Sequence, residues 1–499
     1  MSLDSPRIRF AAALLAGLTA AQVVATIHVA QSNRDLAARM TAVADAGYLP
    51  VPNRITIDTL DALGSAMGGG LFFTATVGAM ITLLTILAAL AFQAPLHRNR
   101  RIAMAFLGLV WFGAIFNQNL DGFNPWASAY FLVIPLVVFP LARRAAEGVR
   151  PRLVPILCHL VVLAILAGLG AGYMTARTFS EIRNRFLLST PAGLAVHDFY
   201  YRYTLYPAEA FKSNGQKLIR VCRFAPGSDP AAVDRIKPRL IRRDYLVIDA
   251  PDVPVDLSLS VTEGVVMLGD TLDLAVGSSA IEFIRSPDQY LDAYSEATDR
   301  NAALREFTFI SLVTVTGLAA YFLVYAPARL AAGVFLSANR AAVAGAGVCL
   351  AVGLAVLAAA EYRSPGPPLE PAAAVQAIHS PELDLRVAAL RTVAQQRIEI
   401  DGRFDWATAL TSPHVAERYW LVHAFMASRS EATLAGLYTL ARDDHIGVAY
   451  QACAGLRLRK DRKAIPVLRG VVTTSPHWYV QGYAYRAMKA LGWRQTGST

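Results

Sequence analysis

The hydrophobic residues of this chain gather into seven long runs that polar segments separate. A helix rises about 1.5 Å per residue, so about 20 apolar residues are needed to cross a hydrocarbon core about 30 Å thick. The pattern predicts seven membrane-spanning helices, at residues 10–30, 68–92, 102–116, 126–142, 153–173, 307–325 and 341–360. The third and fourth runs are short. If both were part of a buried core instead, five spans would remain, and each polar segment outside them would stay on the same side of the membrane.

Composition and charge support this interpretation and give it an orientation. Of 499 residues, 55% are hydrophobic and 17% are charged, which is too apolar for an ordinary soluble protein. Every second short connection is rich in arginine, so the positive-inside rule predicts a cytoplasmic N-terminus and an extracytoplasmic C-terminus in a bacterial inner membrane. A cleaved signal peptide at 10–30 is the competing interpretation. The run is long for a signal, and it ends without a small-x-small cleavage site.

The predicted spans argue against coupled transport and against a bound cofactor. None contains Asp, Glu, Lys or Arg, the residues that usually mark ion pathways. His28 and His159 differ in depth by about 20 Å at 1.5 Å per residue, so one haem cannot join them. The four cysteines show no metal-ligand spacing, so no metal site is predicted. A bridge between Cys222 and Cys453 stays open.

Residues 174–306 predict an extracytoplasmic α+β domain on an amphipathic stalk at 176–189. Strands are expected at 217–224 and 244–249, with two or three more in 255–276. Helices are expected at 229–239 and at 286–305, the second running into the sixth span. Lys and Arg outnumber Asp and Glu by thirteen to five over 177–243, whereas over 244–306 they number three against thirteen.

The aromatic segment 197–213, HDFYYRYTLYPAEAFKS, is the main candidate binding surface. Helical spacing places Phe199, Tyr203 and Tyr206 on one face, while tyrosine rings and basic residues both favour the lipid headgroup zone. The candidate residues for a lipid head, a lipid-linked sugar or a partner helix are Phe199, Tyr200, Arg202, Tyr203, Tyr206 and Lys212. Alternatively, these aromatic residues form the core of the domain.

Two further sets of polar residues carry candidate chemistry. His197 and Asp198 are an acid/base candidate, but neighbours on a helix do not face each other, so helix capping by Asp198 is preferred. The first external loop, 31–67, holds Asp35, Asp45, Asp58 and Asp61. Multi-span membrane glycosyltransferases keep a catalytic base in such a loop, which makes Asp35 and Asp58 alternative catalytic candidates. Those enzymes generally have more spans, and helix caps are the simpler interpretation.

The last quarter of the chain contains a repeat. After a Pro-rich linker at 361–369, four similar phrases begin 32, 31 and 32 residues apart, at Ser380, Ser412, Asp443 and Ser475. Each is a turn followed by an amphipathic helix, with equivalent apolar positions at Ala389, Leu421, Ala452 and Ala484. Over residues 370–494 this resembles HEAT-type helical repeats. The resemblance implies a curved solenoid that binds protein.

Three histidines and one basic turn stand out in the repeats. His414, His445 and His477 occupy the same repeat position, but packed helices would hold them about 10 Å apart, too far for ligands of one ion. They are interpreted as turn residues. The basic turn 457–463 is either solvated or meets an acidic partner.

These patterns predict a polytopic α-helical membrane protein with an inserted extracytoplasmic α+β domain and a C-terminal all-α HEAT-like solenoid. The expected parts are five spans with their loop at 1–173, the α+β domain at 174–306, two spans at 307–360, the linker at 361–369 and the repeats at 370–499. Without a catalytic motif, the expected function is a non-catalytic envelope scaffold or assembly factor. Its expected partners are membrane lipid and a protein bound by the repeats, within a membrane complex, and not nucleic acid. The alternative is an enzyme or carrier for a lipid-linked substrate at the outer membrane face.

Overall fold

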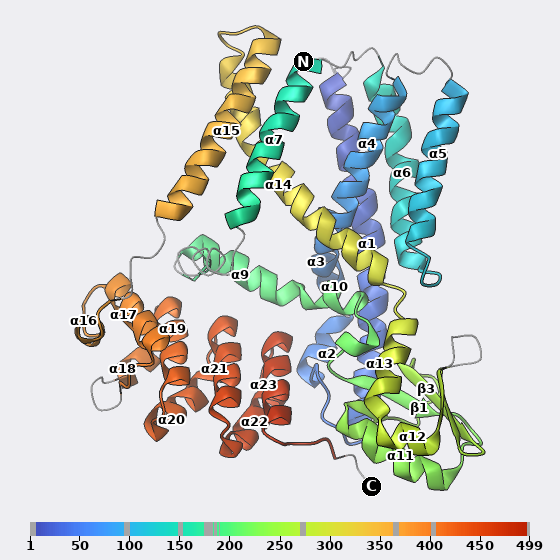
Figure 1. Cartoon of the computed structure of the whole chain (residues 1–499), viewed down its shortest axis with the longest axis vertical. Helices are drawn as coiled ribbons and strands as arrows, with labels where there is room; N and C mark the ends of the chain where they lie inside the picture. Colours follow the sequence, from blue (N-terminus) through green and yellow to red (C-terminus); the bar gives the residue numbers. More distant parts are fainter. Residues whose placement is uncertain are drawn as a thin grey trace. The chain divides into compact units, whose positions relative to one another are not determined.

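The computed structural model describes residues 6–93, 100–147, 153–173, 183, 187–188, 190–269, 276–362, 369–400 and 406–496 (Figure 1). Contacts divide the chain into two compact units. The membrane unit comprises Met1–Val29, Met67–Ile182 and Arg300–Ser364, and the polar unit comprises Ala30–Ala66, Arg183–Asp299 and Pro365–Thr499. Most of the stalk expected at 176–189 and of the linker expected at 361–369 lies outside the described residues.

Seven helices in the described ranges are long and apolar enough to cross a membrane, and they coincide with the seven hydrophobic runs. This confirms the multi-pass helical architecture, including the third and fourth runs, which form helices of 18 and 22 residues. The helices are α1 (Pro6–Asp45), α3, η1 and α4 in one continuous rod (Leu63–Phe73, Thr74–Gly78, Ala79–Gln93), α5 (Arg100–Asn117), α6 (Pro125–Ala146), α7 (Leu153–Tyr173), α14 (Ala302–Ala332) and α15 (Ala338–Tyr362).

Small residues let the last spans approach closely. Ala341 and Cys349 on α15 are buried, and a Cβ added to Gly345 would lie 2.9 Å from the Tyr325 ring of α14. A Cβ on Gly353 would lie 2.4 Å from Leu166 of α7. This stripe therefore serves packing within the bundle.

Helix α1 continues unbroken past its apolar run as far as Asp45. The chain then turns and forms α2 (Arg54–Leu60), which Asn53 caps by accepting a hydrogen bond from the Thr56 N–H. The polar end of α1 and α2 both belong to the polar unit.

A five-stranded sheet forms one part of the polar unit. Its strands are β1 (Arg220–Phe224), β2 (Tyr245–Val247), β3 (Leu257–Thr262), β4 (Val265–Leu268) and β5 (Val276–Ser279), in the order β2-β1-β3-β4-β5. β1 pairs parallel with β2 and β3, and the remaining pairs are antiparallel. Alternate residues of β3 are buried, because one sheet face packs on α11 (Pro230–Arg242) and α12 (Ala280–Arg285).

One expected helix is divided in two. The segment expected to run from 286 into the sixth span forms α13 (Pro287–Ala297), and a separate helix, α14, starts after Asn301. The prediction of a continuous helix was therefore wrong. The backbone leaves the helical conformation at Thr298, whose N–H donates a hydrogen bond to the Tyr294 carbonyl and so caps the end of α13.

Four helices of the C-terminal region pack in succession: α17 (Leu383–Gln396), α19 (Val415–Ala427), α21 (Ile446–Arg459) and α23 (Trp478–Ala490) (Figure 1). Ala389, Leu421, Ala452 and Ala484, the equivalent positions of the repeat, are all fully buried. Shorter helices precede them: α16 (Pro371–Ala377), α18 (Trp406–Leu410), α20 (Glu431–Leu440) and α22 (Ile465–Thr474).

An arginine recurs at one position of this array. Arg386 donates to the Ser380 carbonyl and forms a two-pronged ion pair with Glu417 of the next helix. Arg418, 32 residues later, donates to the Ser412 carbonyl and pairs in the same way with Asp443. These paired hydrogen bonds fix the register between successive helices.

Buried polar contacts join the three segments of the polar unit. Asp256 of the sheet accepts hydrogen bonds from Lys217 and from Arg39 at the end of α1. Burial by itself would raise the pKa of Asp256, but these two cations and the Val221 N–H hold that pKa below its usual range. At the other end of the unit, Asn53 contacts the last repeat.

Candidate functional site

The aromatic segment forms helix α9 (Pro191–Tyr203), followed by the short α10 (Leu205–Ala210). Thr190 caps α9 by accepting a hydrogen bond from the Gly193 N–H, and Pro191 occupies the first turn, where its missing N–H costs nothing. Asp198 lies inside the helix. The expectation that Asp198 caps it was therefore wrong, because the Thr-Pro start lies two turns earlier.

Helix α9 packs across the beginnings of the repeat helices. The Tyr201 hydroxyl lies 3.2 Å from that of Tyr450 on α21, and the Tyr201 ring meets the edge of Tyr479 on α23 at 4.6 Å. Tyr206 is buried, and its ring lies 6.0 Å from Trp478. This part of the aromatic segment is thus held by the repeats and does not belong to the core of the sheet.

The opposite side of α9 leaves aromatic surface open. Phe199 is 48% exposed and Tyr200 is 54% exposed. Phe199 contacts the Tyr203 ring at 4.9 Å, and Tyr203 lies 6.3 Å from Tyr206. Of the expected binding residues, Phe199 and Tyr203 therefore form one aromatic surface, and Tyr200 is exposed beside Tyr201.

The two charged residues expected to accompany this surface differ in environment. Arg202 is exposed near the end of α9. Lys212 forms an ion pair with Glu209 at 2.9 Å, and both side chains are largely buried. Lys212 therefore stabilises the turn after α10, while Arg202 is the charge at the open surface.

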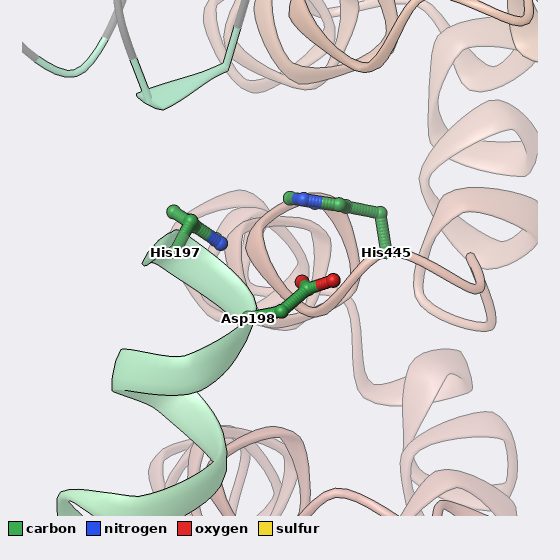
Figure 2. A group of neighbouring side chains, drawn as sticks. All are labelled: His197, Asp198 and His445. Atoms are coloured by element: carbon green, nitrogen blue, oxygen red, sulfur yellow. The ribbon is translucent and has the colours of Figure 1, made fainter. Parts of the chain in front are cut away.

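Three side chains converge where α9 meets α21. His197 and Asp198 belong to α9, His445 precedes α21, and one ligand-type atom from each lies within 4.8 Å of the others. Figure 2 shows the three side chains turned toward one another. The two imidazole rings stack with centroids 4.9 Å apart and planes inclined by 26°.

Both histidines of this His–Asp–His cluster have a buried nitrogen that has no hydrogen-bond partner among the described residues. His197 is 4% exposed, and its Nδ1 is unpartnered. His445 uses Nδ1 to accept a hydrogen bond from the Gly447 N–H, which leaves its buried Nε2 unpartnered. Gly447 provides the space, since a Cβ there would lie 3.1 Å from Cε1 of His197.

Burial keeps these imidazoles neutral at ordinary pH. It lowers the pKa of His197 to about 4, and His445 adds to the lowering, while Asp198 opposes it. Burial also lowers the pKa of His445, again against the effect of Asp198. Neutral imidazole is the form that binds metal ions.

The other repeat histidines have different surroundings. His414 and His477 precede α19 and α23 as His445 precedes α21, in agreement with their interpretation as turn residues. Within the described residues, the cluster contains neither of them. The sequence could not reveal the cluster, because its ligands come from two segments that only the docking of α9 brings together.

Three acidic residues of segment 31–67, namely Asp45, Asp58 and Asp61, lie at a second location. An open pocket of about 830 Å³ lies between the end of α1, α2 and the segment after β2. Asp58 lines this pocket with Asp45, Asp61, Asp249 and Arg34. Asp35 is not among the lining residues, and its carboxylate accepts a hydrogen bond from Gln31 at 2.9 Å.

The two cysteines of the polar unit lie in separate elements. Cys222 lies in β1 and Cys453 in α21, and both are free and buried. The bridge left open by the sequence is therefore absent. Burial raises the pKa of the Cys453 thiol to about 12, which keeps it protonated and unreactive.

Together, fold and site define a multi-pass helical membrane protein whose polar unit holds a His–Asp–His cluster between a docked aromatic helix and a stack of repeat helices. Comparison of the chain with protein-family models, with curated proteins and with solved structures finds no match.

Proposed function

We propose that this chain is a non-catalytic scaffold or assembly factor of the cell envelope, anchored by its spans and binding a protein partner through a HEAT-like solenoid. The observation that carries the proposal is the succession α17, α19, α21 and α23, in which two neighbouring links repeat the same arginine-to-acid contact. Repeats that contact only their neighbours present an extended, fixed surface, which suits protein binding.

The basic turn 457–463 supplies a charged part of that surface. Arg459 is occupied inside the array, where it donates to the Phe425 carbonyl at the end of α19. Arg457, Lys460 and Lys463 are exposed. A partner with acidic residues is the complement of these three cations.

We further propose that the polar unit, the inserted sheet domain included, lies on the extracytoplasmic side of a bacterial inner membrane, with the N-terminus in the cytoplasm. The arginine-rich connections support this orientation. All six lysines belong to the polar unit, so a membrane-impermeant amine reagent tests it directly. Lys460 and Lys463 are expected to react in intact spheroplasts. Reaction only after lysis would reverse the orientation.

Amine crosslinking in native membranes, followed by purification in mild detergent, tests the scaffold function. A second protein is expected to be crosslinked to Lys460, Lys463 or Lys489, the lysines of the repeat region. Lys460→Arg with Lys463→Arg keeps the charge, removes the amines and serves as the control. A lone monomer, or crosslinks only from Lys212, Lys217 and Lys237, would contradict the proposal.

Charge reversal is a gentler perturbation than removing the repeats. Deletion of residues 367–499 would also remove the contacts that hold Asn53, so its effect would not report on partner binding alone. The combined substitutions Arg457→Glu, Lys460→Glu and Lys463→Glu are expected to release the partner. The same change at the exposed Lys237 and Arg239 of α11 is the matched control and should retain it.

One observation favours the alternative of an enzyme or carrier for a lipid-linked substrate, namely the pocket that contains Asp58. That function would require lipid to stay bound through purification, and Asp58→Asn to abolish activity without unfolding the chain. For such a substrate the exposed rings of Phe199 and Tyr200 would be the lipid-contacting surface. Lipid retained by the wild type and lost on changing both rings to Ser would favour this function over the scaffold.

A further inference from the structure

We infer that the open pocket between α1, α2 and the segment after β2 docks a lysine-containing basic segment of a partner protein. The pocket lies wholly within the polar unit and has a volume of about 830 Å³. The inference rests on the proposed scaffold function and deepens it. It gives the polar unit a second partner surface, whose charge is opposite to that of the basic turn 457–463.

One face of the polar end of α1 forms the long wall of the pocket. Its lining residues recur three and four positions apart, so they share one side of the helix. Most of them are small, namely Ala37, Ala38, Thr41, Ala42 and Ala46. Ile57 of α2, with Ile248 and Val253 after β2, adds larger apolar side chains. Small side chains let another chain approach the helix closely, so this wall can pack against the apolar side chains of a docked segment.

Carboxylates surround this apolar wall without a matching number of cations. The charged side chains among the described lining residues are four acids and one base: Asp45, Asp58, Asp61, Asp249 and Arg34. Asp45 lies 3.6 Å from the exposed Arg54, which is a weak surface pair. The other three carboxylates form no ion pair within the described residues. Because like charges gathered in one pocket repel one another, a cationic partner stabilises them.

The spread of these carboxylates favours an extended ligand over a metal ion. In the part of the chain that the structure describes, no three of them lie within 4.8 Å of one another. A calcium ion takes 6–8 oxygen ligands at about 2.3–2.6 Å, so this arrangement does not hold one. A segment with several basic side chains carries its positive charges apart from one another, and it therefore matches the separated carboxylates.

The openness of the pocket favours a protein segment over a small molecule. Pockets of about 300–1,000 Å³ that take a small ligand normally bury about 70–90% of the ligand surface. An open pocket buries less of it. A protein segment does not depend on enclosure, because contacts on both sides of the pocket also hold it. Complementary charge at the rim then attracts the segment and fixes its register.

Zero-length carbodiimide coupling of the full-length protein in native membranes tests this inference, because the reagent joins a carboxylate to an amine that it contacts directly. The linked peptides are identified by mass spectrometry. Amide bonds are expected from Asp58, Asp61 or Asp249 to lysines of one other protein. Coupling should decrease as the salt concentration rises, since exposed ion pairs are screened.

Two pocket variants separate charge from shape. Asp58→Asn with Asp61→Asn keeps the side-chain volumes and removes two charges, so coupling from Asp249 should fall about tenfold. Ala42→Phe keeps every charge but fills the wall, and it should lower coupling from all three carboxylates. The matched control is Asp234→Asn with Glu263→Asn, which changes two exposed acids outside the pocket and should couple like wild type.

The inference fails if no pocket carboxylate couples to another protein, or if coupling from Asp249 persists in both pocket variants. It also fails if the linked lysines belong only to a second copy of this chain, or if lipid stays bound and no protein couples. Should Ala42→Phe change the amide exchange of residues 49–60, the double asparagine variant decides the question. Crosslinks from Lys460 or Lys463 without coupling at the pocket would refute this inference and leave the scaffold function standing.

Discussion

Asn53 joins the first loop to the last repeat, and its replacement by alanine tests whether the polar unit is one body. The residue is 3% exposed. Its Nδ2 donates to the carbonyls of Val472, Thr473 and Ser475, while its Oδ1 accepts from the Thr56 N–H and caps α2. The Asn53 side chain therefore accepts a hydrogen bond from the start of α2 and donates hydrogen bonds to carbonyl groups at the end of α22.

The magnitude follows from these contacts. Loss of an N-cap costs about 1 kcal/mol. The hydrogen bond to the Val472 carbonyl is buried, so that carbonyl would lose its partner at a cost of about 2 kcal/mol, whereas water can reach the other two. The sum is about 3 kcal/mol, which corresponds to roughly 100-fold faster opening.

Amide hydrogen exchange of the full-length protein measures this opening segment by segment. Exchange is expected to rise together in residues 49–60 and 470–481 of Asn53→Ala. Asp229→Ala is the matched control, since Asp229 caps α11 through the Ala231 N–H and its exposed carboxylate makes no second hydrogen bond within the described residues. If Asn53→Ala speeds exchange only in α2, by no more than the control does in α11, the proposed joining role is wrong.

Three other perturbations have defined outcomes. Asp256→Asn removes the buried charge that neutralises two cations, so it should lower the free energy of unfolding by about 3–5 kcal/mol in denaturant titration. Asp288→Asn is the control, because its exposed carboxylate pairs with an arginine, and it should lower that free energy by less than about 1 kcal/mol. The pKa of His197 is about 4 in the folded protein and 6.5 in the unfolded chain, so between these pH values the unfolded state binds more protons than the folded state. The contribution of neutral His197 to folding stability is therefore fully present above pH 6.5. It falls by about 3 kcal/mol on acidification to pH 4. Exchange of residues 191–203 should follow this pH profile, and it should be flat in His197→Phe. Gly447→Ala should weaken the docking of α9 on the repeat helices, because the new methyl group would lie against His197 and His445. Gly470→Ala on α22 has room for the methyl group and should be neutral or stabilising. Equal stability of the two variants would contradict the observed docking.

The membrane spans and several helix starts were predictable because their signals are local. The length of an apolar run alone decides whether its helix can cross a membrane. All seven predicted runs form helices that are long and apolar enough to do so. Asp229 followed by Pro230 begins α11 as expected, because capping depends on residues within one turn. The same reasoning failed at Asp198, where a stronger start at Thr190 precedes it.

The docked face of α9 was not predictable from hydrophobic spacing. That spacing selected Phe199, Tyr203 and Tyr206, but the residues that face the repeats include His197 and Tyr201, four positions apart. Neither residue is strongly apolar. Their burial depends on partners at the starts of α21 and α23, which a local pattern does not contain.

The fourth repeat differs from the first two at the residue that bonds the first loop. Arg386 and Arg418 each stand six residues after the serine that opens their repeat, and each pairs with an acid in the following repeat. The equivalent residues of the third and fourth repeats are Ala449 and Gln481. Gln481 still donates to the carbonyl of its opening serine, Ser475, but its other bonds go to the Asn53 N–H and the Thr56 hydroxyl of the first loop. Residues 53–56 therefore bond the fourth repeat helix at the position where Arg386 and Arg418 bond an acid.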